Sequence, residues 1–180
     1  RGRGLQLTGE ERPRQMPAPV GLPAGVEVIE VERGGDLTVH NPGQLVIYPI
    51  VKLGEGSGDV GAFVRSLEQN VIRVIAEFGV RGYARENSSG VWVDDPTGTR
   101  RKIASVGIAV RKWVSFHGVA LNVDNDLSAF SWIKPCGFES SVMTRLRDLA
   151  TPGSLKPWQA GGRAQVETAL QKSESAKNAL

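Results

Sequence analysis

The chain has 180 residues, of which 40% are hydrophobic and 23% charged, and its formal net charge is +3. This length suits one domain with a sizeable core, and the composition is globular rather than disordered. The charge is too small to predict nucleic-acid binding, and no run of eighteen apolar residues predicts a membrane span. A single cysteine excludes an internal disulfide framework and a multi-cysteine zinc site, and the two histidines have no tight cluster of Asp or Glu beside them, so we expect no metal site.

The first half of the chain predicts a loop, two strands and one long helix. Residues 1–25 carry four prolines without apolar periodicity, which predicts a loop. Residues 26–32 largely alternate apolar and acidic side chains, as in a half-buried strand, and residues 45–51 form a β-rich apolar run. Across residues 59–78 apolar side chains recur every three or four positions, with Asp59 as N-cap and Gly79 as the stop.

The second half predicts more strands and a short helix. Residues 90–93, 102–110 and 114–123 are predicted strands, and residues 94–99 contain a turn sequence. Residues 141–150 predict a short helix capped by Ser140 or Ser141, followed by a polar tail over residues 151–180. We therefore expect one catalytic domain over residues 1–150, with an α/β (α+β) fold in which helices pack on a sheet.

The segment from Arg33 to Gln44 contains residues that strand building does not require. Gly34 and Gly35 permit positive φ and let a ligand approach the backbone. His40 and Gln44 can orient a carbonyl group. The alternative is an ordinary turn between two strands, because clusters of Gly, Asn and Pro are typical of turns.

Lys102 follows two arginines at the mouth of an apolar strand. A lysine at a strand end is ordinarily solvated. If Ile103 and Val106 bury it, its amine can instead accept a proton. Lys102 is therefore a candidate acid/base group, with a solvated lysine as the alternative.

Cys136 lies between Pro135 and Gly137, in a predicted loop rather than on an apolar element. Reactive cysteines need partial exposure and a nearby cation, and this setting favours exposure. The alternative is a small buried apolar side chain, the usual state of a lone cysteine.

Four segments resemble the bacterial octanoyltransferases, or lipoyl(octanoyl) transferases, in family order. They span roughly residues 26 to 147. They are Arg33–Gln44, Lys102–Ile108, Ser115–Val123, and the stretch from Asp126 to Gly137 that contains Asp126-Leu127-Ser128, Phe130 and Pro135-Cys136-Gly137.

The resemblance implies the fold of biotin and lipoate protein ligases, with a mixed, mostly antiparallel sheet and packed helices. It implies that octanoate passes from acyl carrier protein to Cys136, and then to a lysine of a lipoyl domain, with Lys102 as acid/base partner. The implied acceptors are lipoyl domains of 2-oxoacid dehydrogenase complexes and the glycine cleavage H protein, in the cytoplasm, without ATP, metal, nucleic acid or membrane. The implied substrate-binding residues are Arg33, Gly34, Gly35, Asp36, Leu37, Thr38, Val39, His40, Ser105, Val106, Gly107, Gly118, Val119 and Ala120. His40 and nearby backbone N–H groups are further candidates to stabilise an oxyanion.

The chain departs from the family pattern in two places. Asn41 stands where glycine is usual, and asparagine also enters left-handed conformations, so we expect the loop to be kept. Family members carry a helix and strand before a loop like residues 1–25, so we expect an N-terminal truncation.

Two other functions stay open. One is an ATP-dependent lipoate or biotin protein ligase on the same fold, and the other is a non-catalytic relative that binds lipoyl domains. Acyl carrier proteins are acidic, so we expect exposed cations to steer their docking. The candidates are Arg100, Arg101, Arg111 and Lys112.

Overall fold

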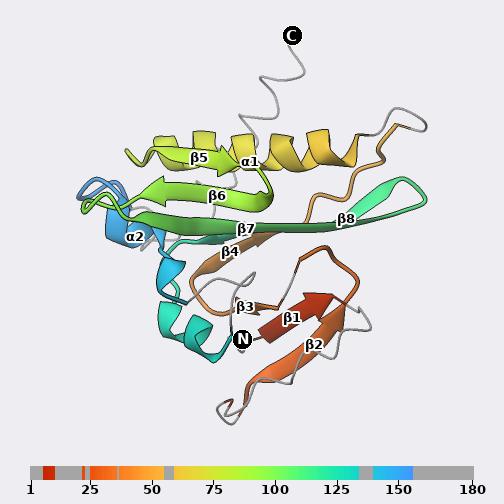
Figure 1. Ribbon diagram of the computed structural model, residues 1–180, viewed down its shortest axis with the longest axis horizontal. Coiled ribbons are helices and arrows are strands. Elements are labelled where there is room, and N and C mark those ends of the chain that lie inside the picture. The colour runs from red at the N-terminus through yellow and green to blue at the C-terminus, as the bar shows by residue number, and fades with distance from the viewer. Residues whose placement is uncertain are drawn as a thin grey trace.

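The computed structural model describes residues 6–10, 22, 25–35, 37–54, 59–133 and 140–155, and these form two β-sheets. Figure 1 shows the smaller sheet beneath the larger one. The smaller has the order β2-β1-β3, with β1 parallel to β2 and antiparallel to β3. Its strands are β1 (Gln6–Glu10), β2 (Glu27–Val31) and β3 (Thr38–His40).

The larger sheet has five strands in the order β4-β8-β7-β6-β5, and every neighbouring pair is antiparallel. Its strands are β4 (Gln44–Ile47), β5 (Gly82–Arg85), β6 (Ser88–Asp94), β7 (Arg100–Arg111) and β8 (Val114–Asn122). The predicted α+β fold with a mixed, mostly antiparallel arrangement of strands and packed helices is therefore confirmed.

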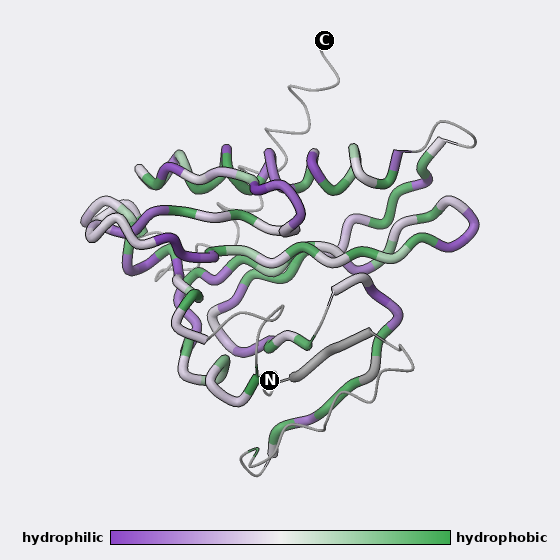
Figure 2. Tube along the Cα trace, viewed as in Figure 1, coloured by the Kyte–Doolittle hydropathy of each residue, from purple (hydrophilic) through white to green (hydrophobic). Residues whose placement is uncertain are grey.

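Helix α1 (Val60–Ala76) packs against the larger sheet. Asp59 caps it as predicted, since its Oδ1 accepts a hydrogen bond from the Ala62 N–H at 2.9 Å. Along α1, apolar and polar segments alternate (Figure 2). The apolar face buries side chains that each stabilise the fold by about 1.5–3 kcal/mol. These are Leu67, Val71, Val74 and Ile75.

Strands β7 and β8 form a long hairpin whose register organises the rest of the fold. Lys112 and Trp113 make the two-residue turn, both at positive φ (50° and 62°), which suits the twist of the strands. The register sets Ser105 opposite Ala120 and Gly107 opposite Gly118. All four residues line a groove between the two sheets.

Some predicted elements differ from those observed. Residues 1–25 do not form only loop, because β1 occupies Gln6–Glu10 and pairs with two other strands. The strand predicted over residues 45–51 is β4, which ends at Ile47, before Pro49, which has no N–H for a ladder. β5 was not predicted.

The predicted helix over residues 141–150 is wrong in length. A 3₁₀ turn occupies Ser140–Val142, and α2 covers only Leu146–Leu149, with no side-chain cap. Between them Met143 pairs with Lys102, the Thr144 N–H donates to the Lys102 carbonyl at 3.0 Å, and Asn122 Nδ2 donates to the Thr144 carbonyl. These tertiary bonds take backbone groups that a continuous helix would use.

A second apolar cluster lies below the larger sheet. Its buried members are Val39, Ala129, Phe130, Ile133 and Met143. It packs β3 against the 3₁₀ helix η1 (Leu127–Trp132), which Asp126 caps through the Ser128 N–H. In the part of the chain that is described, no helix combines the length and apolar character that crossing a bilayer requires.

Candidate functional site

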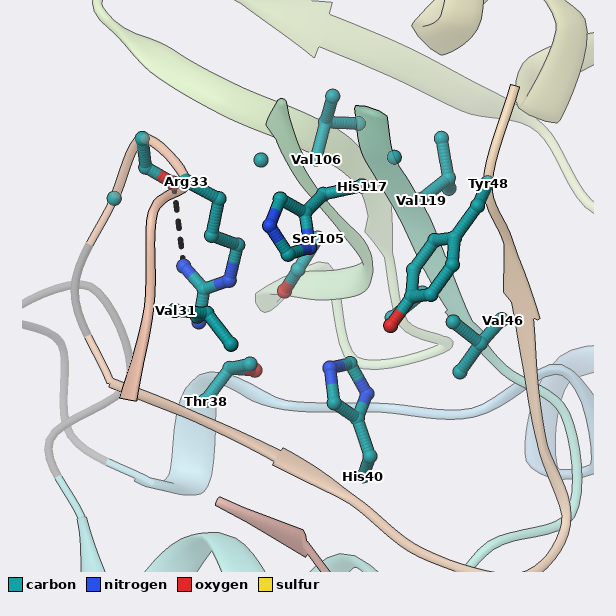
Figure 3. A pocket seen from close by; sticks show the side chains of 15 residues that line it. Val31, Arg33, Thr38, His40, Val46, Tyr48, Ser105, Val106, His117 and Val119 are labelled. Atoms are coloured by element: carbon teal, nitrogen blue, oxygen red, sulfur yellow. Dashed lines mark hydrogen bonds between the residues drawn. The ribbon is translucent and has the colours of Figure 1, made fainter. Parts of the chain in front are cut away.

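A groove lies between the two sheets, where β3 of the smaller sheet approaches the β7–β8 hairpin of the larger sheet (Figure 3). The space between its walls is about 520 Å³ when the open solvent within it is included. Its walls come from strands β3, β4, β7 and β8, from the end of β2, and from the loop that follows β2. The lining residues are Val31, Arg33, Gly34, Gly35, Thr38, His40, Val46, Tyr48, Ser105, Val106, Gly107, His117, Gly118, Val119 and Ala120.

Glycines shape one end of the groove by leaving out side chains. A Cβ on Gly107 would lie 2.6 Å from the Gly34 carbonyl oxygen, and one on Gly118 would lie 2.1 Å from the Ile47 carbonyl oxygen. The Gly34 N–H donates to the Ile108 carbonyl at 3.0 Å, which ties the loop after β2 to β7. Backbone therefore packs directly on backbone here, and any larger residue would force the wall to move.

Two imidazoles project into the groove (Figure 3). Burial lowers the pKa of His40, with Arg33 and His117 acting in the same direction and the Gln44 hydrogen bond opposing them. Burial also lowers the pKa of His117, helped by Arg33 and opposed by Glu32. Both rings are therefore biased toward the neutral form at neutral pH.

Lys102 is only 1% exposed, so the alternative of a solvated strand-end lysine is wrong. Its Nζ lies 5.5 Å from the centroid of the Trp92 ring. The β6–β7 register shifts here, since Val91 pairs with Ala104 but Trp92 pairs with Lys102. Such a bulge turns side chains away from the regular alternation and is frequent next to active sites.

Gly90 makes the space that Lys102 fills. It has a φ of 126°, and a Cβ there would lie 2.4 Å from the Ala104 carbonyl oxygen and 2.7 Å from Lys102 Cε. Its N–H donates to Oε1 of Glu68 at 2.8 Å, a carboxylate that is only 4% exposed. A buried acidic side chain of α1 thus fixes the backbone that borders Lys102.

A chain of side-chain amides links the groove to the segment paired with Lys102. His40 Nδ1 lies 2.7 Å from Gln44 Oε1, and Gln44 Nε2 contacts Asn122 Oδ1 at 2.8 Å. Asn122 Nδ2 donates to the Thr144 carbonyl, and Thr144 in turn bonds to the Lys102 backbone. Because these groups connect four elements, the position of His40 is coupled to that of β7.

The structure brings most of the predicted substrate-binding residues to this one groove. Leu37 and Val39 lie outside its lining and belong to the second apolar cluster, because alternation along β3 turns Thr38 and His40 toward the groove and Val39 away. Asp36 and Cys136 lie outside the described residues. Their predicted roles therefore stay predictions.

Sequence reasoning missed several residues of the site. His117 lines the groove at a φ of 59° and packs edge-on against Tyr48, with ring centroids 5.8 Å apart. A histidine beside a glycine at mid-strand was the available signal. Gly90 and Glu68 gave no comparable signal, because their importance follows only from the placement of Lys102.

The expectation that Asn41 adopts a left-handed conformation is wrong. Asn41 is not among the positive-φ residues of the described chain, whereas Gly43 has a φ of 89°. Asn41 instead donates through Nδ2 to the Asp126 carbonyl at 2.7 Å. The amide therefore tethers the β3–β4 loop to the cap of η1.

The predicted steering cations do not form one patch. Arg100 and Arg101 lie at the start of β7, and Arg111 and Lys112 lie at its far end, about 35 Å away for an extended strand of this length. Arg101 pairs with Asp95 at 2.9 Å, and Arg111 pairs with Glu32 at 2.7 Å.

Comparison with known proteins gives the family. The model of the lipoyl protein ligase A/B catalytic domain matches residues 16–160. An octanoyltransferase of Desulfotalea psychrophila is 48% identical over 122 residues, covering 68% of this chain and 53% of that protein. An octanoyltransferase of Geobacter metallireducens is 45% identical over 125 residues, covering 69% and 56%. The chain thus spans little more than half the length of the curated relatives it matches.

Solved structures of low identity share the fold. A T. acidophilum protein described as a lipoate protein ligase with bound lipoic acid has a TM-score of 0.67 at 14% identity, covering 97% of this chain and 69% of that one. Lipoate-protein ligase A bound with ATP has a TM-score of 0.65 at 16% identity, covering 97% and 68%. Because the family model matches residues 16–160, which are most of the chain, the chain belongs to the lipoyl protein ligase A/B catalytic domain family.

Proposed function

We propose that this chain transfers an octanoyl group from octanoyl-acyl carrier protein to a lipoyl-domain lysine, through a thioester on Cys136 and with Lys102 as acid/base group. The burial of Lys102 is the observation that carries this proposal. A lysine that is 1% exposed has left solvent, and this is costly unless the site uses or compensates it.

The segment that contains Cys136 is held at both of its described ends. Ile133 packs in the second apolar cluster, and Ser140 begins the turn that leads to Met143. Met143 pairs with Lys102, and the Ser141 carbonyl accepts a hydrogen bond from Arg101. Because these contacts anchor the chain four to seven residues beyond Cys136 at Lys102, they support a Cys136–Lys102 pair.

The first half-reaction exchanges one thioester for another. Lys102 takes the proton of the Cys136 thiol, and the sulfur forms a bond to the acyl carbon. The bond from that carbon to the carrier sulfur breaks, and the proton passes from Lys102 to the departing sulfur. Octanoate is then held on Cys136 without any change in oxidation state.

The second half-reaction forms an amide. The lysine amine of the lipoyl domain bonds to the acyl carbon, and the bond to Cys136 sulfur breaks. One amine proton passes to Lys102 and then to the sulfur, so that the enzyme regains its thiol. Since the thioester-to-amide step is downhill, the reaction consumes no ATP.

The groove suits the acyl chain in this proposal. Its walls include the apolar side chains of Val46, Val106 and Val119. The 48% identical octanoyltransferase supports the same acyl group. The proposal includes octanoyl-acyl carrier protein as the donor. It also includes lipoyl domains of 2-oxoacid dehydrogenases and the glycine cleavage H protein as acceptors, and a cytoplasmic site of action.

The test is intact mass spectrometry in the absence of ATP. Incubation with octanoyl-acyl carrier protein should add one octanoyl group to the chain, and an apo lipoyl domain added afterwards should acquire it. An ATP-dependent ligase or a non-catalytic binding relative gives no covalent acyl group under these conditions. Octanoylation that appears only when ATP and free octanoate are supplied would replace the proposal by the ligase alternative.

Cys136→Ala makes the test specific, because Cys136 is the only thiol in the chain. This variant should form no acyl-enzyme and transfer no octanoate, while its melting temperature stays near that of the parent. Transfer at the parental rate would contradict the thioester mechanism.

A further inference from the structure

His40 and its amide partners form a hydrogen-bonded chain whose proton positions can be worked out. His40 Nδ1 lies 2.7 Å from Gln44 Oε1, and Gln44 Nε2 lies 2.8 Å from Asn122 Oδ1 and 3.2 Å from the Val39 carbonyl. Asn122 Nδ2 lies 3.0 Å from the Thr144 carbonyl. Amide orientations and histidine tautomers have to be inferred from such networks.

Two backbone carbonyls, which can only accept hydrogen bonds, fix the orientation of both side-chain amides and the tautomer of His40. The Thr144 carbonyl requires the NH₂ group of Asn122, so Asn122 presents its oxygen to Gln44. The Val39 carbonyl and the Asn122 oxygen both require the NH₂ group of Gln44, so Gln44 presents its oxygen to His40. That oxygen can only accept, and His40 Nδ1 must therefore carry a proton.

The register places His40 at the Lys102 end of the groove. Gln44 pairs with Asn122 in the sheet, two residues beyond the position where Ala120 faces Ser105. His117 and the Gly107–Gly118 pair lie toward the other end of the same two strands. His40 is thus beside the end where the proposed chemistry takes place, and its ring extends into the groove (Figure 3).

The surroundings favour a neutral ring. Burial lowers the pKa of His40, and the charged or titratable groups that act on it are Arg33 of the loop after β2 and His117 of β8, both of which lower it further. Gln44 is uncharged and only partly opposes them. A neutral ring with a proton on Nδ1 has a bare lone pair on Nε2.

We propose that Gln44 and Asn122 hold His40 as its Nδ1–H tautomer, so that Nε2 accepts a hydrogen bond from the attacking amine of the acceptor lysine. This rests on the proposed function for the identity of the amine. It replaces the oxyanion role expected for His40, because a bare Nε2 has no proton to donate to an oxyanion.

The two protons of the attacking lysine amine interact with different groups. His40 Nε2 holds the proton that remains on nitrogen in the amide product, and the other proton passes to Lys102 as the carbon–nitrogen bond forms and the carbon–sulfur bond to Cys136 breaks. His40 orients the nitrogen lone pair toward the acyl carbon and undergoes no net change. Gln44 and Asn122 are positioning residues that act through His40.

The tautomer can be measured directly, since His40 and His117 are the only histidines. Long-range ¹H–¹⁵N spectra of histidine-labelled protein contain two imidazoles, and His117→Asn leaves only His40, with a residue that tolerates positive φ in place of His117. At neutral pH His40 should show a protonated Nδ1 and an unprotonated Nε2. The opposite tautomer, or a charged ring, overturns the assignment without any activity measurement.

Gln44→Glu and Gln44→Met test the positioning role. A carboxylate beside Nδ1 should raise the pKa of His40 by about one to two units, and the acid limb of the pH–rate profile for acyl discharge should move up equally. Below that pKa Nε2 carries a proton and cannot accept. Gln44→Met removes the acceptor, so both tautomers should appear and discharge should slow about tenfold at unchanged acyl loading.

Gln69→Glu is the matched control, because it adds the same charge at an exposed position of α1. It should leave the tautomer and the pH profile unchanged. An acid limb that does not move in Gln44→Glu, in a variant that remains folded by its spectrum, overturns the role of His40 in discharge. If no octanoyl transfer occurs in the parent chain but the Nδ1–H tautomer is found, the proposed function fails and the tautomer assignment stands.

Discussion

At the Lys102 end of the groove, buried polar side chains set the geometry, whereas at the His117 end it is set by glycines. Next to the first end lie buried Lys102 and Glu68, outside the groove lining, and the series of hydrogen bonds from His40 to Asn122. At the second, Gly107 and Gly118 let carbonyls approach the sheet directly. A polar end suits bond making and breaking, and the apolar Val106 and Val119 side chains along β7 and β8 suit a flexible acyl tail.

The largest losses of stability and transfer rate are expected when the space beside Lys102 is filled. Gly90→Ala should destabilise the fold by about 2–4 kcal/mol, because it adds strain at a φ of 126° and a contact at 2.4 Å. It should also reduce octanoyl transfer about 100-fold by displacing Lys102. Urea unfolding and single-turnover rates measure the two effects.

Gly98→Ala is the control for that substitution. Gly98 has a φ of 78°, but nothing lies within 4 Å of a Cβ there. It should lose stability through strain alone and keep its transfer rate. Equal rate losses in the two variants would show that the effect of Gly90 is not local to Lys102.

At the opposite end, Gly107→Ala should change chain-length preference rather than chemistry. The new Cβ would meet the Gly34 carbonyl at 2.6 Å and push the loop after β2. We expect kcat/KM for octanoyl donors to fall about tenfold, with a smaller fall for hexanoyl donors, since each buried methylene contributes about 0.8 kcal/mol. Equal losses for both donors would place the acyl tail elsewhere.

The two ends also differ in how they should meet an acidic carrier protein. Arg100 and Lys112 are both exposed, at opposite ends of β7. Because the reacting end is that of Lys102, Arg100→Gln should raise the KM for the carrier about threefold at low salt, and Lys112→Gln should leave it unchanged. The Arg100 effect should fade as salt screens exposed charges beyond roughly 10 Å at 0.1 M. The reverse pattern would move the docking site to the hairpin tip.

The smallest expected effect concerns Asn41. Asn41→Gly removes the hydrogen bond to the Asp126 carbonyl and should cost about 1 kcal/mol. Gly43→Ala should be more harmful, because Gly43 has a φ of 89° and a Cβ there would lie 2.7 Å from the Asn125 nitrogen. Thermal melts compare the two, and tolerance of alanine at Gly43 would contradict the loop geometry.

The parts that sequence predicted best are those with local signals. Helix α1 shows its period, its Asp59 cap and its Gly79 stop within one window, and the β7–β8 strands are long apolar runs. The short strands β1 and β5 and the interrupted helix after Ser140 depend on pairing with distant residues. Thr144, for example, bonds to Lys102 and Asn122, which no local pattern reveals.

The candidate site divides in the same way. Residue types and the family resemblance indicated Lys102, His40 and the glycines of the groove, because unusual residues stood in recognisable segments. Gly90, Glu68 and the tautomer of His40 follow from three-dimensional contacts alone. Asn41 shows the opposite error, since a sound conformational preference was assigned to the wrong residue of its loop.

The central claim, that buried Lys102 moves protons for Cys136, is tested most directly by single-turnover kinetics of Lys102→Arg. Arginine keeps the positive charge but cannot give up its proton at accessible pH. Because the arginine charge can still hold Cys136 as a thiolate, acyl-enzyme should form and accumulate, but it should discharge slowly to the lipoyl domain. Lys112→Arg at the exposed hairpin tip should behave as the parent. Normal discharge by both Lys102→Arg and Lys102→Ala would contradict the claim and remove Lys102 from the mechanism.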